Sequence, residues 1–147
     1  SVKHAVNEAL AILRSRLART PCEIVEDLTE VDVQAAEGQL VRVLANLLNN
    51  ALDAMEGCDK RQIVIAASVE PQQVVLRLSD SGPGIPDSVR ERLFQPFFST
   101  KAAGQGLGLG LALSRDVVRE MNGDLTAGND PHGGGAVFCV TLPLADS

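Results

Sequence analysis

The sequence contains no Trp or Tyr and only four Phe, so aliphatic side chains must build almost all of its core. It has no uninterrupted apolar run of about 18 residues, which argues against a membrane-spanning helix within it. Its three cysteines are an odd number without ligand-like spacing, which predicts reduced thiols rather than disulfides or a zinc site. A formal net charge of −6 at pH 7 argues against a nucleic-acid partner.

The length of 147 residues and the hydrophobic content of 45% predict one globular domain over residues 1–147, which we expect to be monomeric when isolated. No apolar signal-peptide core follows Lys3 and His4. A start at Ser1 rather than Met indicates a piece cut from a longer protein. We therefore expect a cytoplasmic domain, and an inner-membrane anchor elsewhere in the parent protein stays compatible with the sequence.

Hydrophobic periodicity predicts a domain with three helices and five strands. Pro71 separates two β-rich runs as a hairpin, and Asn122 with Gly123 is expected to stop the last helix. Because helices alternate with mostly adjacent strands, the expected fold is a two-layer α/β sandwich. The expected helices cover residues 2–18, 38–55 and 107–121, and the expected strands cover 22–28, 62–69, 73–79, 124–128 and 136–142.

The second predicted helix has an unusual polar face. Asn46, Asn50 and Asp53 lie opposite its apolar residues, and Asn46 and Asn50 stand one turn apart. Asparagine is a mediocre helix former, so three of them within five residues cost helix stability. Amide oxygens suit a hard cation such as Mg²⁺ that ATP phosphates also hold. The alternative is an ordinary solvated stripe on an amphipathic helix.

A second motif, Asp80-Ser81-Gly82-Pro83-Gly84-Ile85, directly follows a predicted strand. A plain turn is the simpler interpretation, because Asp, Gly and Pro are turn residues. The functional hypothesis is that Asp80 accepts a hydrogen bond from an adenine amino group. Gly82 and Gly84 would then let the backbone approach the base closely.

A third motif runs from Gly104 to Leu111 and alternates glycine with other residues at a helix start. Such glycines offer N–H groups and a helix N-terminus to phosphates, and a hinge is the alternative. Three of the four Phe lie between the two glycine motifs, where core packing is the simpler role. Lys101 is either a surface lysine or a contact of the γ-phosphate. Gly133–Gly135 is expected to allow two backbones to approach closely rather than to bind ligand.

Taken in this order, the motifs resemble the GHKL ATPase and kinase family, which includes histidine kinases, type II topoisomerase ATPase domains, Hsp90 and MutL. Residues 47–54 look like its N box, 80–85 its G1 box, 94–98 its F box, 104–110 its G2 box and 133–135 its last glycine box. The resemblance implies a mixed sheet covered on one face by three helices. It also implies an ATP lid, at about residues 87–105, that is mobile without nucleotide.

The resemblance also implies the site. It makes Asn50 the Mg²⁺ ligand and Asn46, Asn50 and Lys101 the catalytic residues. ATP would be bound by residues in or near all the boxes but the last: Asn46, Asn50, Asp53, Asp80, Gly82, Gly84, Ile85, Phe94, Lys101, Gly104, Gly106, Leu107, Gly108 and Leu109.

The branch of the family is indicated by Asn46 and by two short runs of the sequence. Hydrolases of this fold carry a general-base Glu where this chain has Asn46, and an amide cannot take a proton from water, so rapid hydrolysis is disfavoured. The runs 50–55 and 96–101 are similar to sensor histidine kinases of the nitrogen-regulation and C4-dicarboxylate type. One departure is Asp53, where many kinases place a basic or aromatic residue facing the phosphates.

Neither of the two histidines, His4 and His132, resembles a phosphoacceptor. The resemblance therefore implies a catalytic domain that donates the γ-phosphoryl group of ATP to a histidine on a separate dimerisation domain, with a response regulator downstream. Two alternatives stay open: a stand-alone serine kinase acting on a sigma-factor regulator, and a nucleotide-binding module without transfer activity.

Overall fold

The computed structural model describes residues 1–28, 31–90, 92–94, 110–131 and 135–144. Five strands form one mixed sheet in the order β1-β2-β3-β5-β4, in which only the β1–β2 pair is parallel. The strands are β1 (Glu23–Asp27), β2 (Gln62–Val69), β3 (Gln73–Asp80), β4 (Asp124–Asn129) and β5 (Ala136–Pro143). The helices are α1 (Val2–Ile12), α2 (Arg14–Arg19), α3 (Glu37–Ala54), α4 (Asp87–Arg90) and α5 (Gly110–Glu120).

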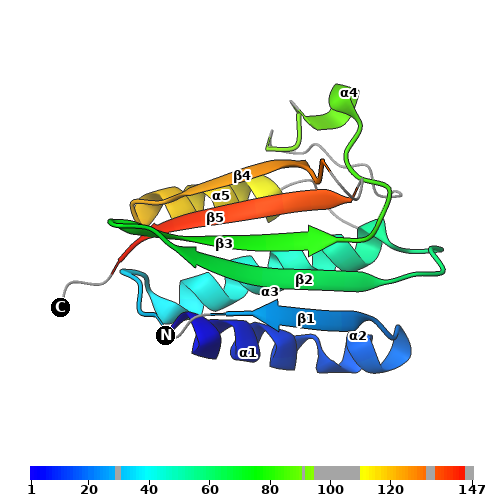
Figure 1. Cartoon of the computed structure of the whole chain (residues 1–147), viewed down its shortest axis with the longest axis horizontal. Helices are drawn as coiled ribbons and strands as arrows, with labels where there is room; N and C mark the ends of the chain where they lie inside the picture. The colour runs from blue at the N-terminus through cyan, green and yellow to red at the C-terminus, as the bar shows by residue number, and fades with distance from the viewer. Residues whose placement is uncertain (29–30, 91, 95–109, 132–134, 145–147) are drawn as a thin grey trace.

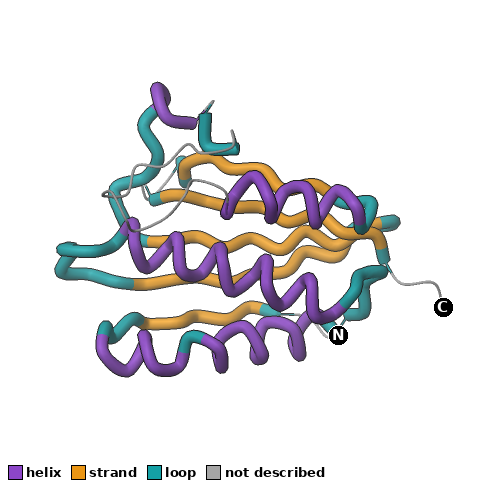
Figure 2. The backbone as a smooth tube through the Cα atoms, turned by 180° about the vertical axis from the view of Figure 1, so that it is seen from behind, coloured by secondary structure: helices purple, strands orange, loops and turns teal. Residues whose placement is uncertain are grey.

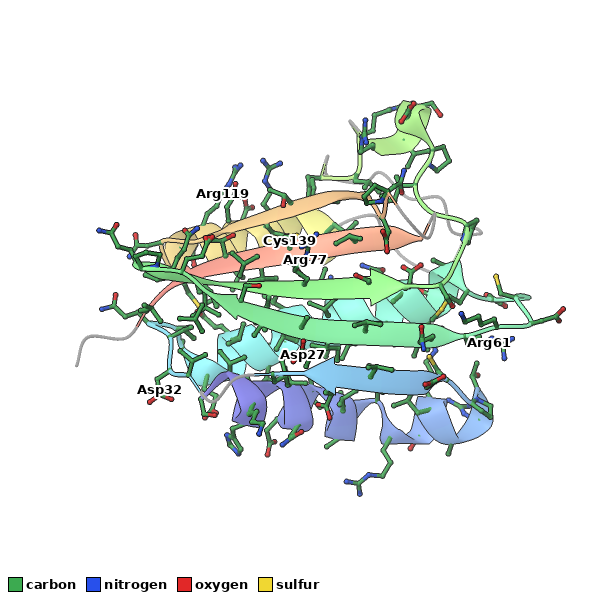
Figure 3. The ribbon with its side chains drawn as sticks, viewed as in Figure 1. Asp27, Asp32, Arg61, Arg77, Arg119 and Cys139 are labelled. Atoms are coloured by element: carbon green, nitrogen blue, oxygen red, sulfur yellow. The ribbon has the colours of Figure 1, made fainter. Side chains whose placement is uncertain are left out.

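The two-layer sandwich predicted from the sequence is confirmed (Figure 1). Seen from behind, the helices α1 with α2, α3 and α5 form three rows across one face of the sheet (Figure 2). The opposite face carries Arg77 and Cys139, which are paired in register and labelled in Figure 3. Arg77 is exposed and Cys139 is half-buried, and none of the described helices lies over this face (Figure 1 and Figure 2). No helix in the described ranges is long and apolar enough to cross a membrane.

The core lies between the two layers and is aliphatic, as the lack of aromatic residues predicted. One face of α3 supplies many of its large side chains, and alternate residues of the strands supply many of the others. Side chains with less than 2% exposure include Leu40, Leu44, Leu47, Leu48, Ile63, Ile65, Leu76 and Leu125. At about 25 cal/mol per Å² of apolar area, this burial is the main stabilising contribution to the fold. The amphipathic pattern of α3 therefore sets which way its polar stripe points.

The predicted first helix, residues 2–18, is interrupted at Leu13, where the structure has two helices. The N–H of Leu13 bonds the carbonyl of Leu10, three residues back instead of four, which tightens and ends the last turn of α1. The break mattered little for the hydrophobic pattern, since Leu13 is still buried. It separates α1, which packs along α3, from α2, which reaches the end of α3.

One further element was not predicted from the sequence, and the end of the last helix was. The long segment after β3 contains a short helix, α4, which begins directly after Pro86, a residue whose fixed φ favours a helix start. The last helix is described from Gly110, and it ends as predicted. Asn122 adopts a left-handed φ of 65°, and the N–H of Gly123 bonds the carbonyl of Val118.

Candidate functional site

Asp80 is the last residue of β3 and the only carboxylate buried in the described part of the chain, with 8% of its surface exposed. Its Oδ1 accepts hydrogen bonds from the backbone N–H groups of Gly82 (2.9 Å) and Ala136 (3.4 Å). Burial raises the pKa of this carboxyl, and the two backbone N–H groups oppose that rise. An acceptor fixed in this way, at the end of a strand, can select a ligand that presents an N–H donor.

Glycines surround Asp80 for steric reasons. A Cβ on Gly135 would lie 1.8 Å from the backbone oxygen of Asp80, which no side chain can tolerate. A Cβ on Gly82 would lie 3.0 Å from Asp80 Oδ1 and 3.2 Å from the carbonyl oxygen of Ala54. Gly84 has a φ of 85°, which favours glycine. The close approach predicted for the last glycine box is thus confirmed at Gly135, and Gly82 makes room for Asp80 itself.

The G1 loop (residues 80–85) is also held from β4, by a residue that the sequence did not reveal. The side chain of Asn129 accepts from the N–H of Ile85 at 2.7 Å and donates to the carbonyl of Ile85 at 2.8 Å. Both backbone groups of Ile85 are therefore satisfied by one amide, in the way that a strand neighbour would satisfy them. An Asn at a strand end is a common turn residue, so no local signal marked it.

The C-terminal end of α3 meets this loop. The Oγ of Ser81 lies 3.4 Å from the sulfur of Met55, the residue that caps α3. The N–H of Gln62, at the start of β2, donates to the same Oγ at 2.9 Å. Two motifs that are about 30 residues apart in the sequence, the N box and the G1 box, therefore lie next to each other in the structure.

The polar stripe of α3 lies between two other helices. Nδ2 of Asn46 donates to Oγ of Ser114 on α5 at 2.9 Å, and Ser114 is itself buried. This bond directs the amide nitrogen toward α5 and leaves the carbonyl oxygen of Asn46 as its acceptor end. Asn50 and Asp53 follow on the same stripe and are half-buried. Ser114 was not predicted, because a lone Ser within a helix carries no signal of its partner.

Arg16 on α2 contacts the polar stripe of α3 from the side opposite to α5 (Figure 2). One of its terminal nitrogens, Nη2, lies 2.6 Å from Oδ1 of Asp53, and the other, Nη1, lies 2.8 Å from Oδ1 of Asn49. A longer contact of 3.4 Å joins Nη1 to the carbonyl oxygen of Asn49. The side chains of Arg16 and Asp53 are 29% and 30% exposed, so this ion pair is partly shielded from solvent. Asp53 thus contacts Arg16, and its predicted nucleotide contact stays a prediction.

Phe94 marks the start of the predicted F box. It is partly buried against the core, and the guanidinium carbon of Arg115 on α5 lies 4.7 Å from the centre of its ring. This cation–π contact joins the chain after α4 to α5. Packing was the simpler role expected for the Phe residues, and for Phe94 the structure agrees.

Six of the predicted site residues lie outside the described residues. They are Lys101, Gly104, Gly106, Leu107, Gly108 and Leu109. The same holds for His132. The other histidine, His4, is on α1 and lies 2.5 Å from Glu37 at the first turn of α3. Asn50 follows Glu37 by 13 positions on α3, or about 20 Å at 1.5 Å per residue, so His4 is remote from Asn50.

The residues present fit a magnesium–nucleotide complex better than a metal held by protein alone. Within the described ranges, no group of three His, Cys, Asp or Glu could hold a metal ion. The stripe instead offers amide oxygens, which suit a hard cation that takes its remaining ligands from phosphates and water. Asp80 offers the separate acceptor that a nucleotide base would need.

Comparisons with known proteins agree with this geometry. The family model described as "Histidine kinase-, DNA gyrase B-, and HSP90-like ATPase" matches residues 35–146. The C4-dicarboxylate transport sensor protein DctB of Pseudomonas aeruginosa is 38% identical over 142 residues, which are 95% of this chain and 23% of that protein. The chain therefore spans about a quarter of the length of this curated relative.

Solved structures extend the likeness to the whole fold. The mycobacterial sensor histidine kinase MprB superposes with a TM-score of 0.86 at 26% identity, covering 99% of this chain and 97% of that one. Full-length ShkA, solved in complex with AMPPNP, gives a TM-score of 0.82 at 25% identity, covering 100% of this chain and 31% of that one. The chain belongs to the family of histidine kinase-, DNA gyrase B- and HSP90-like ATPases, and within it is an ATP-binding catalytic domain of the sensor histidine kinase type.

Proposed function

We propose that this domain binds Mg²⁺-ATP between the G1 loop and the polar stripe of α3, and donates the γ-phosphoryl group to a histidine on a separate dimerisation domain. The observation that carries the proposal is the meeting of two dissimilar walls: a buried acceptor at Asp80 and an amide stripe at Asn46 and Asn50. The first suits an adenine amine and the second suits phosphates with their cation.

The residues have separate roles in this proposal. Asp80 accepts from the adenine amine, and Asn50 supplies an oxygen ligand to Mg²⁺. When bound, Mg²⁺ would neutralise part of the phosphate charge. Asn46, oriented by Ser114, stands where a hydrolase has its general base, so water is poorly activated and the phosphoryl group is kept for a better nucleophile. Catalysis then consists of positioning and charge stabilisation.

Of the two histidines, His4 is remote from Asn50 and His132 lies outside the described residues, so the proposal takes the acceptor histidine from another domain. A dimerisation domain of the same parent protein would supply it, and a response regulator would take the phosphoryl group afterwards. ATP is a cytoplasmic substrate, so we place the domain on the cytoplasmic side, whether or not the parent protein is anchored in a membrane.

The test is phosphotransfer from γ-labelled ATP, with and without a histidine hairpin from a related kinase. We expect no label on the chain alone and acid-labile label on the hairpin. Transfer would be slow, since separate molecules lack the effective concentration of a covalent link. Acid-labile label on the chain alone would contradict the proposal. Acid-stable label on a serine of an added protein would favour the serine kinase, and binding without any transfer would favour the non-transferring module.

Asn50→Ala tests the metal role in the same assay. The variant should lose at least about tenfold in Mg²⁺-dependent ATP affinity, because a contact to a charged group is removed. Gln39→Ala is the matched control, since Gln39 is an exposed polar residue of the same helix, three turns earlier. Equal affinities of the two variants would reject Asn50 as the ligand.

A further inference from the structure

The short helix α2 brings a positive charge to the N-box helix. Arg16 is half-buried, while Arg14 and Arg19 on the same helix are exposed. Among these three arginines, it is Arg16 whose guanidinium contacts α3 in the structure, through Asn49 and Asp53. Arg16 lies on α2, which Leu13 separates from α1.

The positive charge of Arg16 is close to Asn50, the residue proposed to bind Mg²⁺. Asp53 follows Asn50 by three residues, so the two side chains lie within about one turn of each other on the same side of α3. Asp53 alone would make this wall of the site negative and repel phosphates. Paired with Arg16 at 2.6 Å, it instead holds a cation there.

The guanidinium of Arg16 has enough N–H donors to bind α3 and a phosphate group at the same time. It has five N–H donors in a planar fork, and the contacts with Asn49 and Asp53 account for at most three of them. The planar fork also matches the oxygens of a phosphate group better than an ammonium does. Asp53 and Asn49 would then act as positioning residues that hold the arginine in place before ATP binds.

We propose that Arg16 is a phosphate-binding residue of this domain, positioned by Asp53, and that it supplies from α2 the positive charge that α3 lacks at position 53. The proposal rests on the function proposed above, since it takes the α3 stripe as the phosphate side of the site. It explains why an acidic residue is compatible with phosphate binding at this position.

The test compares the affinities of ATP, ADP and adenosine, measured by calorimetry on the full chain at fixed Mg²⁺. Arg16→Gln should weaken ATP binding by at least about tenfold, ADP binding by less, and adenosine binding by less than about twofold. Arg14→Gln is the matched control, because it removes the same charge from an exposed site two residues away. This control should bind all three ligands as the wild type does.

A purely structural role for Arg16 predicts a different pattern. If the arginine only joined α2 to α3, Arg16→Gln would lower the unfolding temperature and weaken ATP and adenosine binding equally. A second variant moves the charge: Arg16→Gln with Asp53→Arg places a cation on α3 itself. We expect this double variant to regain most of the lost ATP affinity.

Each outcome of these measurements supports or overturns the role proposed for Arg16. Equal ATP affinity in Arg16→Gln and Arg14→Gln, with a wild type that binds Mg²⁺-ATP, would overturn the role of Arg16 and leave the proposed function intact. An equal loss for ATP and adenosine, or a failure of the double variant to recover, would also overturn it. A wild type that binds no Mg²⁺-ATP would overturn both proposals.

Discussion

The two walls of the site are built by different means. At Asp80 the acceptor is held by backbone N–H groups, and the space around it exists because Gly82 and Gly135 have no side chains. On α3 the polar groups are held by side chains of other helices, Ser114 on one side and Arg16 on the other. Backbone atoms cannot be exchanged by substitution, whereas each side-chain pair can be removed on its own. A substitution at Gly82 or Gly135 should therefore cause a large loss of stability on the Asp80 side of the site. Removing one side-chain pair on α3 should cause only a small loss.

The largest effect is expected from Gly135→Ala. The new Cβ would lie 1.8 Å from the backbone oxygen of Asp80, so β3 and the start of β5 must move apart. We expect a loss of about 3 kcal/mol or more in the free energy of unfolding, measured by urea denaturation. Gly128→Ala is the control, because a Cβ there meets nothing within 4 Å. Equal stabilities of the two variants would show that the Asp80 side of the site is not sterically fixed.

Asp80→Asn should change the selection of the nucleotide base while keeping the hydrogen bonds that hold the side chain in place. The amide oxygen can still accept from Gly82 and Ala136, but the second carboxylate oxygen is replaced by an NH₂ group, which cannot accept from the adenine amine. Wild type should prefer ATP over GTP by at least about tenfold, or about 1.4 kcal/mol, and the variant should lose most of this preference. Calorimetry with both nucleotides on each protein measures it. An unchanged ratio would remove Asp80 from base selection.

The free energy of unfolding of Asp80→Asn should depend on pH differently from that of the wild type. Burial raises the pKa of Asp80, so its ionised form opposes folding at neutral pH. Wild type should gain stability as the pH falls through the raised pKa, toward the pKa of the unfolded chain. Asn cannot ionise, so we expect Asp80→Asn to be the more stable protein at neutral pH and to lose that advantage on acidification. Urea denaturation of both proteins at a series of pH values checks this.

Asn129→Ala should loosen the G1 loop without breaking it. Two exposed hydrogen bonds to the backbone of Ile85 are lost, so we expect a cost of about 1–2 kcal/mol in stability. Faster amide hydrogen exchange at Ile85 is the direct measurement. Asn7→Ala, an exposed asparagine on α1, is the control. Unchanged exchange at Ile85 would mean that the loop is held by Asp80 and the glycines alone.

Ser114→Ala is expected to have the smallest effect. It removes one bond to Asn46 and should cost less than about 1 kcal/mol in stability. Transfer to the histidine hairpin should fall several-fold while adenosine affinity stays constant, because the Asn46 amide is then free to rotate. Ser15→Ala, an exposed serine on α2, serves as the control. A change in adenosine affinity as large as the change in transfer would contradict an effect confined to the α3 side of the site.

Local patterns were sufficient for most of the fold. The apolar spacing in α3 and the alternation in β2 and β3 predicted those elements to within one or two residues, because burial of a face imposes its period on the sequence. The break at Leu13 was missed since Leu13 keeps the apolar period while its backbone leaves the helix. Helix α4 was missed because four residues are too few to show a period.

The sequence by itself determined the family, the order of the elements and the residue types of both walls, because these follow from local spacing and from motifs. Only the tertiary structure decided which side chains meet. Arg16 and Asp53 are 37 positions apart, Ile85 and Asn129 are 44 apart, and Asn46 and Ser114 are 68 apart. Such pairs depend on how the helices and loops pack against the sheet and against one another. A single polar residue gives no local sign of the partner that packing brings to it.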